Sequence, residues 1–427
     1  MGILTELLQD VPLPRMIKVR QNFSATEIQD VAGVLRGEIA QAGVTGQIRP
    51  GMRIAVAVGS RGVAEIPLIV RVVVEELKKC GAVPFIVPAM GSHGGATAEG
   101  QTEMLASLGI TEASSGCPIV SSMDTVELGV LENGLPVLID RHAFEADGIV
   151  VINRIKAHTA FSGAYESGLV KMMTIGLGKH KGAASCHALG FRYMADNIVK
   201  MAGIHIKKAA YLFGVGTIEN ACEKIARIVV VPAGKIFATE PDLLVAAKAN
   251  MPKILLQPLD ILIVDQLGKE FSGGGMDPHV TGRAPTRDVS VGPRPTRIVA
   301  LDLTERSHGN ATGIGNAHFT TRRFFDKLEL DSTYANVITA TVVESARIPL
   351  IMASDRMAVQ GAVKTSLVSR PEKVRIVRIP NTLHLGEIYI SEVMLDEAQR
   401  HPDITVTGQP EDWVFDPNGN LTDIGAW

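Results

Sequence analysis

The amino-acid sequence predicts an α/β fold of two domains built on mainly parallel sheets. Short runs rich in Val and Ile alternate with helical patterns along most of the chain, which is typical of parallel strands joined by helices. The 427 residues are too many for one small core. Aromatic residues make up only 4%, so the cores must be filled mainly by Val, Ile, Leu, Ala and Met.

Strands are expected in two sets, and helices follow the first of them. In the first set, strands at 53–58, 84–89 and 148–153 each lead into a loop, and helices are expected over 63–82 and from about Thr97. A further apolar run at 227–234 precedes residue 240, and the second set contains the runs at 260–265, 296–303, 348–355 and 374–381.

An acidic helical stretch at 240–253 separates the two sets and places a boundary near 250–258. We therefore expect an N-terminal domain of residues 1–255, carrying cofactor-anchoring and acid/base residues, and a C-terminal domain of residues 256–427, carrying substrate-binding residues. The final stretch, 386–408, could pack back on the first domain.

Composition excludes several classes of protein. The formal charge of −3 and the lack of a Lys/Arg run argue against nucleic-acid binding. The N-terminus has no secretory signal pattern, and Arg71 interrupts the most apolar run before it could span a membrane. Four cysteines are scattered without CxxC spacing: Cys80, Cys117, Cys186 and Cys222. These features predict a soluble cytoplasmic protein with no nucleic-acid or membrane partner.

Polar side chains follow four of the expected strands. Arg61 follows 53–58, His93 follows 84–89, His158 follows 148–153, and Gln266 with Lys269 follows 260–265. Ligands of open α/β sheets bind beyond the carboxyl ends of the strands. Because one pair lies on the second domain, we expect the active site in an interdomain cleft.

The two loop histidines could exchange protons with a hydroxyl group near neutral pH, since free imidazole titrates at about 6.5. His93 lies between glycines in GSHGG, and His158 lies in KAHTAFSG. A racemase needs a proton carrier for each enantiomer, so a pair is more informative than one histidine. Each could also be an ordinary loop or capping histidine.

The segment from His158 to His187 adds an amine and a further imidazole. Lys171 lies in apolar surroundings, where desolvation can turn lysine into a nucleophile or covalent anchor. His187 follows a helical stretch and could bind a metal. On local grounds alone, Lys171 fits better a lysine that snorkels from a helix flank, and His187 fits better a satisfied core histidine.

Cationic and amide groups could hold a carboxylate substrate. Arg61 and Lys269 offer charge, and Gln266 can hold a hydroxyl or carboxylate oxygen.

The basic stretch GLGKHKG at 176–182 could contact phosphate. No dinucleotide fingerprint, phosphate loop, HExxH or GxSxG pattern occurs, which disfavours a nicotinamide dehydrogenase.

Taken in order, these residues resemble the lactate racemase family, whose members use a nickel-pincer nucleotide. The resemblance rests on an arginine after the first strand, a Gly-x-His loop, and a histidine before an FSG turn. It continues with a lysine, a third histidine and a Gln-x-x-Lys pair. In this chain the matching elements are Arg61, His93, His158, Lys171, His187, Gln266 and Lys269.

The resemblance implies a role for each residue. Lys171 would carry the covalently attached pyridinium-3-thioamide-5-thiocarboxylate mononucleotide, and His187 would be a nickel ligand in a near-planar site, which suits Ni(II). His93 and His158 would alternate as general base and acid on the substrate hydroxyl. Arg61, Gln266 and Lys269 would orient a 2-hydroxy acid. The implied partners are that substrate and the proteins that synthesise the cofactor.

Departures from the lactate-specific pattern indicate another substrate. The turn before Arg61 lacks the acidic residue of the lactate enzymes, the stretch before Lys171 is lengthened by AYES, and the loop GGGMDPHVTGR differs. We therefore expect a racemase or epimerase of another 2-hydroxy acid, such as a larger sugar acid. Two alternatives stay open: a zinc hydrolase or lyase using His93, His158 and His187, and a non-catalytic nucleotide- or metal-binding homologue.

Overall fold

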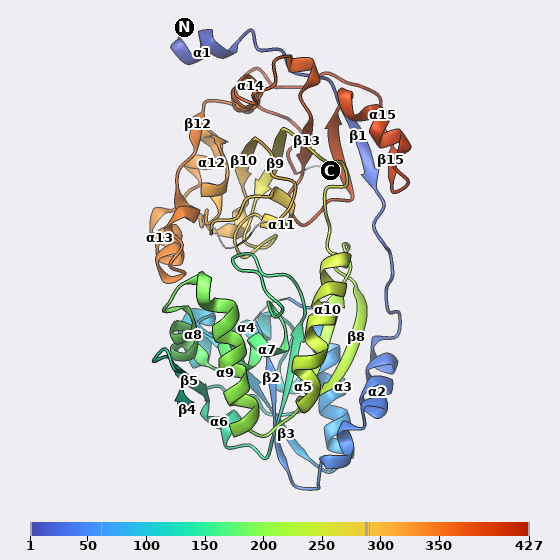
Figure 1. Cartoon of the computed structure of the whole chain (residues 1–427), viewed down its shortest axis with the longest axis vertical. Helices are drawn as coiled ribbons and strands as arrows, with labels where there is room; N and C mark the ends of the chain where they lie inside the picture. Colours follow the sequence, from blue (N-terminus) through green and yellow to red (C-terminus); the bar gives the residue numbers. More distant parts are fainter. Residues whose placement is uncertain (1, 61, 287–288, 290, 426–427) are drawn as a thin grey trace. The chain divides into compact units, whose positions relative to one another are not determined.

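The chain forms two compact units, and one of them is made of two separate parts of the sequence. The computed structural model describes residues 2–60, 62–286, 289 and 291–425. Ala25–Met251 form one unit, here called the inserted unit, and Met1–Ser24 together with Pro252–Trp427 form the discontinuous unit. Figure 1 shows the elements of both.

The inserted unit is built on a mainly parallel sheet. Its described strands run in the order β3 (Val83–Pro88), β2 (Arg53–Val58), β6 (Gly148–Arg154), β7 (Tyr211–Glu219) and β8 (Ile225–Pro232). The first four are parallel neighbours, and β8 runs antiparallel to β7. A separate hairpin pairs β4 (Thr125–Val130) with β5 (Pro136–Asp140).

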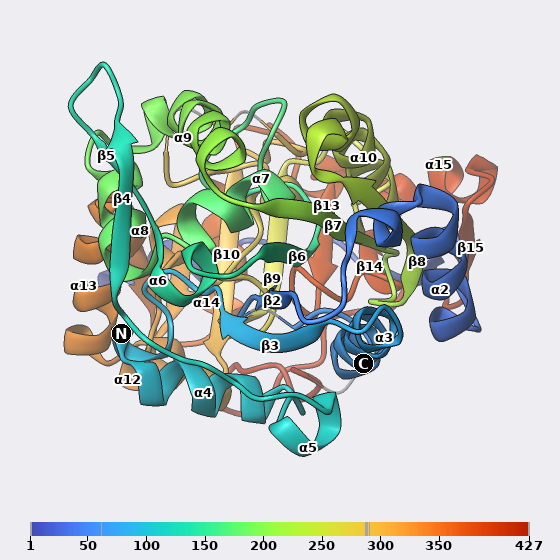
Figure 2. The ribbon, with the colours of Figure 1, turned by 90° about the horizontal axis from the view of Figure 1, so that it is seen from below.

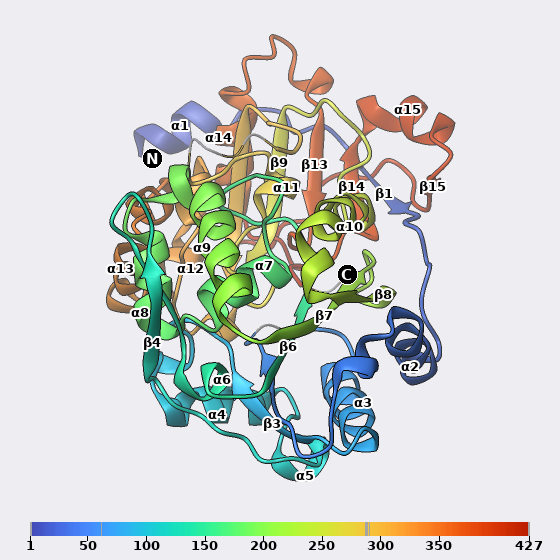
Figure 3. The same ribbon diagram turned by 60° about the horizontal axis from the view of Figure 1, so that its bottom comes forward.

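Helices cover both faces of this sheet. One face packs against α7 (Leu169–Lys171), α8 (Lys179–His187), α9 (Met194–Lys208) and α10 (Ile236–Asn250). The other packs against α2 (Val31–Ala42), α3 (Ile66–Lys79) and α4 (Ala98–Ser107), and the short helix α5 (Glu112–Ser115) lies against α3. The short helix α6 (Arg141–Phe144) follows β5. Figure 3 shows α7 between α9 and α10, above β6 and β7.

Side chains of the central strands alternate between the two cores, as expected for period-2 strands buried on both faces. Ala55 and Ala57 of β2 face the core with α7 to α10, whereas Ile54, Val56 and Val58 face the core with α2 and α3. All five are fully buried, so the sheet is a rigid support for the loops that follow it.

The discontinuous unit contains a larger mixed sheet. Its described strands run in the order β12 (Leu350–Met352), β11 (Phe319–Thr321), β10 (Arg297–Leu303), β9 (Ile261–Leu267), β13 (Ile376–Ile379), β14 (Glu387–Ser391), β1 (Met16–Gln21) and β15 (Ile404–Val406). The first five are parallel, and the last three pair antiparallel. Its helices are α1 (Ile3–Leu8), α11 (Pro278–Thr281), α12 (Arg322–Asp326), α13 (Leu330–Thr339), α14 (Asp355–Lys364) and α15 (Leu395–Arg400).

The N-terminal residues differ from the expected division into 1–255 and 256–427. Strand β1 pairs with β14 and β15, and its Ile17 and Val19 are fully buried in this sheet. Burial of these side chains and the ladder hydrogen bonds explain why 1–24 belong with the C-terminal half. The final stretch, which carries β14 and β15, also belongs to this unit.

The predicted α/β fold with mainly parallel sheets is confirmed. The strand expected at 53–58 has those bounds, the strand expected at 84–89 lies one residue earlier, and the strand expected at 148–153 extends one residue further, to Arg154. Within the described chain, no helix combines the length and apolar character needed to cross a bilayer. The interdomain cleft stays a prediction.

Candidate active site

Three of the predicted loops start at one edge of the inserted unit's sheet. Strands β3, β2 and β6 are parallel neighbours, so their carboxyl ends meet at this edge (Figure 2). The loops beyond them carry His93, Ser60 and His158. Arg61, predicted in the loop after β2, lies outside the described residues. His93 and His158, the two predicted proton carriers, therefore lie in loops at the same edge of the sheet.

The segment with Lys171 packs onto the same strand ends. A Cβ atom added to Gly59, directly after β2, would lie 2.8 Å from Cε of Met172. Asn153 near the end of β6 donates from Nδ2 to the carbonyl oxygen of Gly168 at 2.8 Å. Lys171 lies between Gly168 and Met172, so the edge that presents the histidines also receives this lysine.

The His93 loop is shaped by glycine and held by a buried amide. Gly91 and Gly94 have φ of 59° and 64°, the left-handed region that glycine adopts without strain. Gln101 Nε2 donates to the carbonyl oxygens of Gly91 at 3.0 Å and His93 at 3.2 Å. The His93 side chain is exposed, and its Nδ1 shares a hydrogen bond with the Ser60 hydroxyl.

The His158 loop is held by a buried carboxylate. Glu166 is fully buried and accepts from the backbone N–H of His158 at 2.7 Å and of Gly163 at 3.1 Å. Lys248 Nζ lies 2.7 Å from the same carboxylate and balances its charge. The ring Nδ1 of His158 accepts from the backbone N–H of Ala160 at 3.1 Å. The half-buried imidazole therefore has a defined orientation.

An aromatic side chain connects His158 with His187. The Phe191 ring centroid lies 6.2 Å from that of His158 and 5.4 Å from that of His187, the latter edge to face. Burial and then the charge of Lys171 lower the pKa of His187 to about 4. Its Nδ1 is buried, and no hydrogen-bond partner lies within reach among the described residues. His187 is thus neutral at pH 7, the form in which imidazole binds metals.

Lys171 ends a short helix whose start is held by Glu240. This buried carboxylate on α10 accepts from the backbone N–H of Val170 at 2.9 Å, and burial raises its pKa to about 7. A Cβ at Gly168 would lie 2.1 Å from Glu240 Oε1, so glycine is needed there. After Lys171 the chain continues as a π-helical turn, Met172–Gly176, a form frequent at functional sites.

A second lysine of this segment has a different environment. Lys179 is fully buried, 3.1 Å from Asp140 Oδ2, and its Nζ donates to Pro88 O at 2.6 Å and Gln101 Oε1 at 3.2 Å. It opens helix α8, which ends at His187. The predicted phosphate contact of GLGKHKG cannot involve this amine, because it is enclosed by protein acceptors. Lys179 instead joins the end of β3, α4 and α8.

Sequence reasoning missed the groups that hold the site residues. Glu166 and Glu240 are isolated acids, and Ser60 precedes Arg61 in a short turn. The stretch AYES contains Glu166, but in the sequence it only marks a difference from the lactate-specific pattern and does not indicate that this acid holds the His158 loop. A fully buried lysine is rare, and only the fold reveals its partner, Asp140, because the two lie on different elements.

Lys269 follows β9 in the discontinuous unit, as predicted, whereas Gln266 lies inside this strand, which is two residues longer than expected at its carboxyl end. Lys269 Nζ donates to Gly273 O at 2.7 Å and Asn336 Oδ1 at 2.6 Å, and its backbone N–H donates to Ser307 Oγ. These contacts fix the position of the ammonium group. Gln266 occupies the end of β9, where its side chain is partly exposed.

A buried ion triad supports the strand that carries Gln266. Arg378 on β13 lies 2.8 Å from Asp265 Oδ2 and 2.8 Å from Asp423 Oδ1. Because Asp265 directly precedes Gln266, this fully buried pair limits movement of the strand end.

The loop that departs from the lactate-specific pattern contains a carboxylate–imidazole pair. His279 Nδ1 lies 2.9 Å from Asp277 Oδ1. Farther along, Arg283 contacts the ring of His318, whose pKa is lowered to about 4 by burial and then by Arg283. These residues belong to the discontinuous unit.

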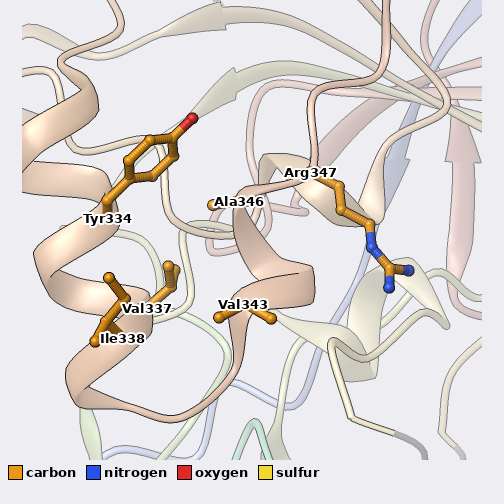
Figure 4. A pocket seen from close by; sticks show the side chains of 6 residues that line it. All are labelled: Tyr334, Val337, Ile338, Val343, Ala346 and Arg347. Atoms are coloured by element: carbon orange, nitrogen blue, oxygen red, sulfur yellow. The ribbon is translucent and has the colours of Figure 1, made fainter.

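A pocket on the discontinuous unit contains none of the predicted site residues. It is mainly apolar and is lined by Tyr334, Val337, Ile338, Val343, Ala346 and Arg347 (Figure 4). Its residues come from α13 and the turn that follows, away from β9 in the sequence.

The three histidines do not form a zinc site in the described chain. Among the described residues, no cluster of three or more His, Cys, Asp or Glu side chains has the geometry to hold a metal ion. A zinc site built from His93, His158 and His187 would require such a cluster. The nickel site that the resemblance implies needs only one protein ligand, His187, and therefore does not require such a cluster.

A family model and two solved structures are similar to this chain. The chain matches the family model of the lactate racemase N-terminal domain over residues 6–197. It is similar in fold to the lactate racemase apoprotein from Thermoanaerobacterium thermosaccharolyticum, with a TM-score of 0.50 and 14% identity, covering 87% of this chain and 99% of that one. A crystal structure from Thermotoga maritima gives a TM-score of 0.48 and 13% identity, covering 64% and 71%. No curated protein sequence matches the chain.

Proposed function

We propose that the chain is a member of the lactate racemase family that racemises or epimerises a 2-hydroxy acid with a nickel-pincer nucleotide, since residues 6–197 match the model of the lactate racemase N-terminal domain. The observation that carries this proposal is the pairing of Lys171 with a neutral His187. The imidazole has a buried nitrogen for which the described residues provide no hydrogen-bond partner, and the nearby lysine lowers its pKa. An unsatisfied buried donor or acceptor costs free energy unless a ligand uses it.

These residues fit the cofactor that the family implies. Lys171 would carry the nucleotide through a thioamide, and His187 would offer its lone pair to nickel. When bound, the nickel-pincer nucleotide would supply a hydride acceptor. Glu240 and Asn153 keep the backbone of the Lys171 segment in place through Val170 and Gly168.

His93 and His158 would handle the proton of the substrate hydroxyl. The carbon–hydrogen bond of a 2-hydroxy acid is poorly acidic, because proton loss would add negative charge beside the carboxylate. Removing the hydrogen as hydride avoids this charge and requires only that a base take the hydroxyl proton. The product is a transient 2-keto acid, and return of hydride to its other face inverts the configuration.

Substrate orientation would depend on Arg61, Gln266 and Lys269. Arginine and lysine attract the carboxylate, and the amide of Gln266 can bind the hydroxyl or a carboxylate oxygen. The contacts of Lys269 with Gly273 and Asn336 would keep its charge in one position. The Asp277–His279 pair in the divergent loop supports a substrate with more polar groups than lactate, such as a sugar acid.

Covalent attachment can be tested by intact mass spectrometry. The protein would be produced together with the cofactor-synthesis proteins, which we propose as its partners. We expect an adduct of nucleotide size that disappears in Lys171→Ala and persists in Lys181→Ala, an exposed lysine of the same segment. An unmodified wild-type mass would contradict covalent attachment.

Turnover is tested separately on the loaded enzyme. A panel of single enantiomers of 2-hydroxy acids, from lactate to sugar acids, would be followed by chiral chromatography. We expect interconversion of at least one compound, faster for larger acids than for lactate. A loaded protein that converts none of them would instead be a non-catalytic homologue.

A further inference from the structure

The side chain of Gln101 on α4 is fully buried and contacts both the His93 loop and Lys179. Its Nε2 donates to the carbonyl oxygens of Gly91 at 3.0 Å and His93 at 3.2 Å. Its Oε1 accepts from Lys179 Nζ at 3.2 Å. The NH2 group of this amide therefore holds the loop, and its oxygen holds the lysine.

Lys179 determines which way the amide faces. An ammonium group can only donate and a carbonyl oxygen can only accept, so the amide oxygen must face Lys179 and the NH2 group must face the loop. Three acceptors lie near the ammonium nitrogen: Gln101 Oε1 at 3.2 Å, Pro88 O at 2.6 Å and Asp140 Oδ2 at 3.1 Å. A flipped amide would oppose donor to donor on one side and acceptor to acceptors on the other.

The backbone of Lys179 is strained. Its φ is 56°, in the left-handed region that residues other than glycine rarely adopt. Its ammonium group is also fully buried, which costs free energy unless acceptors surround it. Strained residues cluster at functional sites, where the surrounding structure keeps them in place. Strain and burial at one residue therefore favour a role for the Lys179–Gln101 contact beyond packing.

The His93 loop also packs directly on the helix that ends at His187. The backbone N–H of Gly91 donates to Gly176 O at 3.2 Å, and a Cβ atom at Gly91 would lie 3.4 Å from Cβ of Ala183 on α8. Lys179 is the first residue of α8. The Gln101 side chain therefore connects three elements: α4, the His93 loop and α8.

We propose that Gln101 is the positioning residue for His93: its amide fixes the loop at two carbonyl oxygens and so sets the place of the imidazole relative to α8. This inference rests on the proposed function, in which His93 moves the proton of the substrate hydroxyl. Proton transfer requires heavy atoms within hydrogen-bond reach. A displacement of about 1 Å therefore slows the step about 10²-fold, although the bonds that bind the substrate stay in place.

Two substitutions separate the donors of this amide from its acceptor. Gln101→Glu keeps an oxygen for Lys179, but an ionised carboxylate cannot donate to the loop. Gln101→Met can neither donate nor replace the amide oxygen as a strong acceptor, and it keeps the unbranched shape of the side chain. Glu103→Met, at an exposed position of the same helix, is the matched control.

Hydrogen–deuterium exchange of the full chain without cofactor tests the hold on the loop. Backbone amides of residues 91, 93, 96 and 97 donate hydrogen bonds and report its opening. We expect them to exchange about 10-fold faster in Gln101→Glu and Gln101→Met and at the wild-type rate in Glu103→Met. Strand β2 should keep its wild-type exchange, which shows that the variants are folded. Wild-type exchange of the loop in Gln101→Glu would overturn the proposal.

Kinetics of the loaded enzyme test the effect on catalysis. We expect kcat to fall about 10²-fold in Gln101→Glu and Gln101→Met with little change in KM, while intact mass shows the wild-type adduct. A loosened loop with unchanged kcat would overturn the positioning role. A loaded wild type that converts no 2-hydroxy acid would overturn the proposed function instead, and the exchange experiment, which needs no cofactor, separates the two failures.

Discussion

Lys171 and Lys179 lie in one glycine-rich segment but in opposite environments. Lys179 is fully buried and satisfied by Asp140, Pro88 and Gln101. Lys171 is only partly buried and lies close enough to His187 to lower its pKa. A lysine enclosed by protein acceptors serves the fold, whereas one beside a neutral imidazole can serve chemistry. Sequence alone does not separate the two, because the acceptors that enclose Lys179 lie on other elements of the fold.

The largest effect is expected from Lys171→Ala. We expect racemisation to fall to background while the free energy of unfolding changes by less than about 1 kcal/mol, since the side chain is partly exposed. Chiral chromatography and urea unfolding measure the two quantities on one preparation. A variant that is inactive because it is unfolded would assign Lys171 to the fold.

Lys179→Met, in contrast, should lower mainly the free energy of unfolding. It leaves the carboxylate of Asp140 buried without its cation, and such losses cost about 3–5 kcal/mol. Urea unfolding checks this, with Lys181→Met, an exposed neighbour, as the matched control. A loss no greater than that of the control would mean that the buried pair contributes little.

Glu240→Gln tests how the start of the Lys171 helix responds to pH. Burial raises the pKa of Glu240 to about 7, above its ordinary 4.5, so the folded state holds a proton that the unfolded state releases. The stability from this group is present below about pH 4.5 and is lost as pH rises through 7. The change amounts to at most about 3 kcal/mol.

Glu240→Gln should remove the part of the pH dependence of stability that comes from Glu240. Unfolding free energies of wild type and Glu240→Gln, measured between pH 4.5 and 8, should converge at the acid end and differ in slope above it. Parallel curves over the whole range would mean that Glu240 is ionised in the folded protein.

Glu166→Gln is expected to lower stability less than Lys179→Met does. One neutral acceptor would replace a carboxylate that binds two backbone N–H groups and Lys248, which costs about 1–3 kcal/mol. Because the His158 loop loosens, kcat should fall more than KM rises. Glu103→Gln, at an exposed glutamate, is the control. Unchanged kcat would show that Glu166 does not position His158.

Much of the fold is predictable because buried parallel strands have a plain pattern. Strands β2, β3 and β6 are nearly continuous runs of apolar residues, and the loops after them carry His93 and His158. Strand β7 was missed because YLFGVGTIE contains glycines, which a close approach of Leu169 to Gly214 requires. Strand β1 was missed as part of the second sheet, since its partners lie far along the chain.

The sequence predicts the reactive side chains of the candidate site, but it does not predict the residues that hold them in place. His93, His158, Lys171 and His187 belong to one unit, and their roles stay predictions. The groups that hold them act through backbone amides, and no spacing rule marks such contacts: Glu166 reaches a loop nearby in sequence, whereas Glu240 lies on a distant helix. Ser60 and Ala160 reach the Nδ1 atoms of His93 and His158 only through the geometry of the folded loops.

Placing β1 in the discontinuous unit has a consequence for how the chain is made. The first 24 residues leave the ribosome well before the strands that they pair with, while residues 25–251 can already assemble their own sheet. Until residues 387–406 are synthesised, β1 lacks the two strands that it pairs with. Pairing across more than 360 residues is slow to find, so the apolar segment around Ile17 and Val19 is expected to stay exposed longer than the strands of the inserted unit.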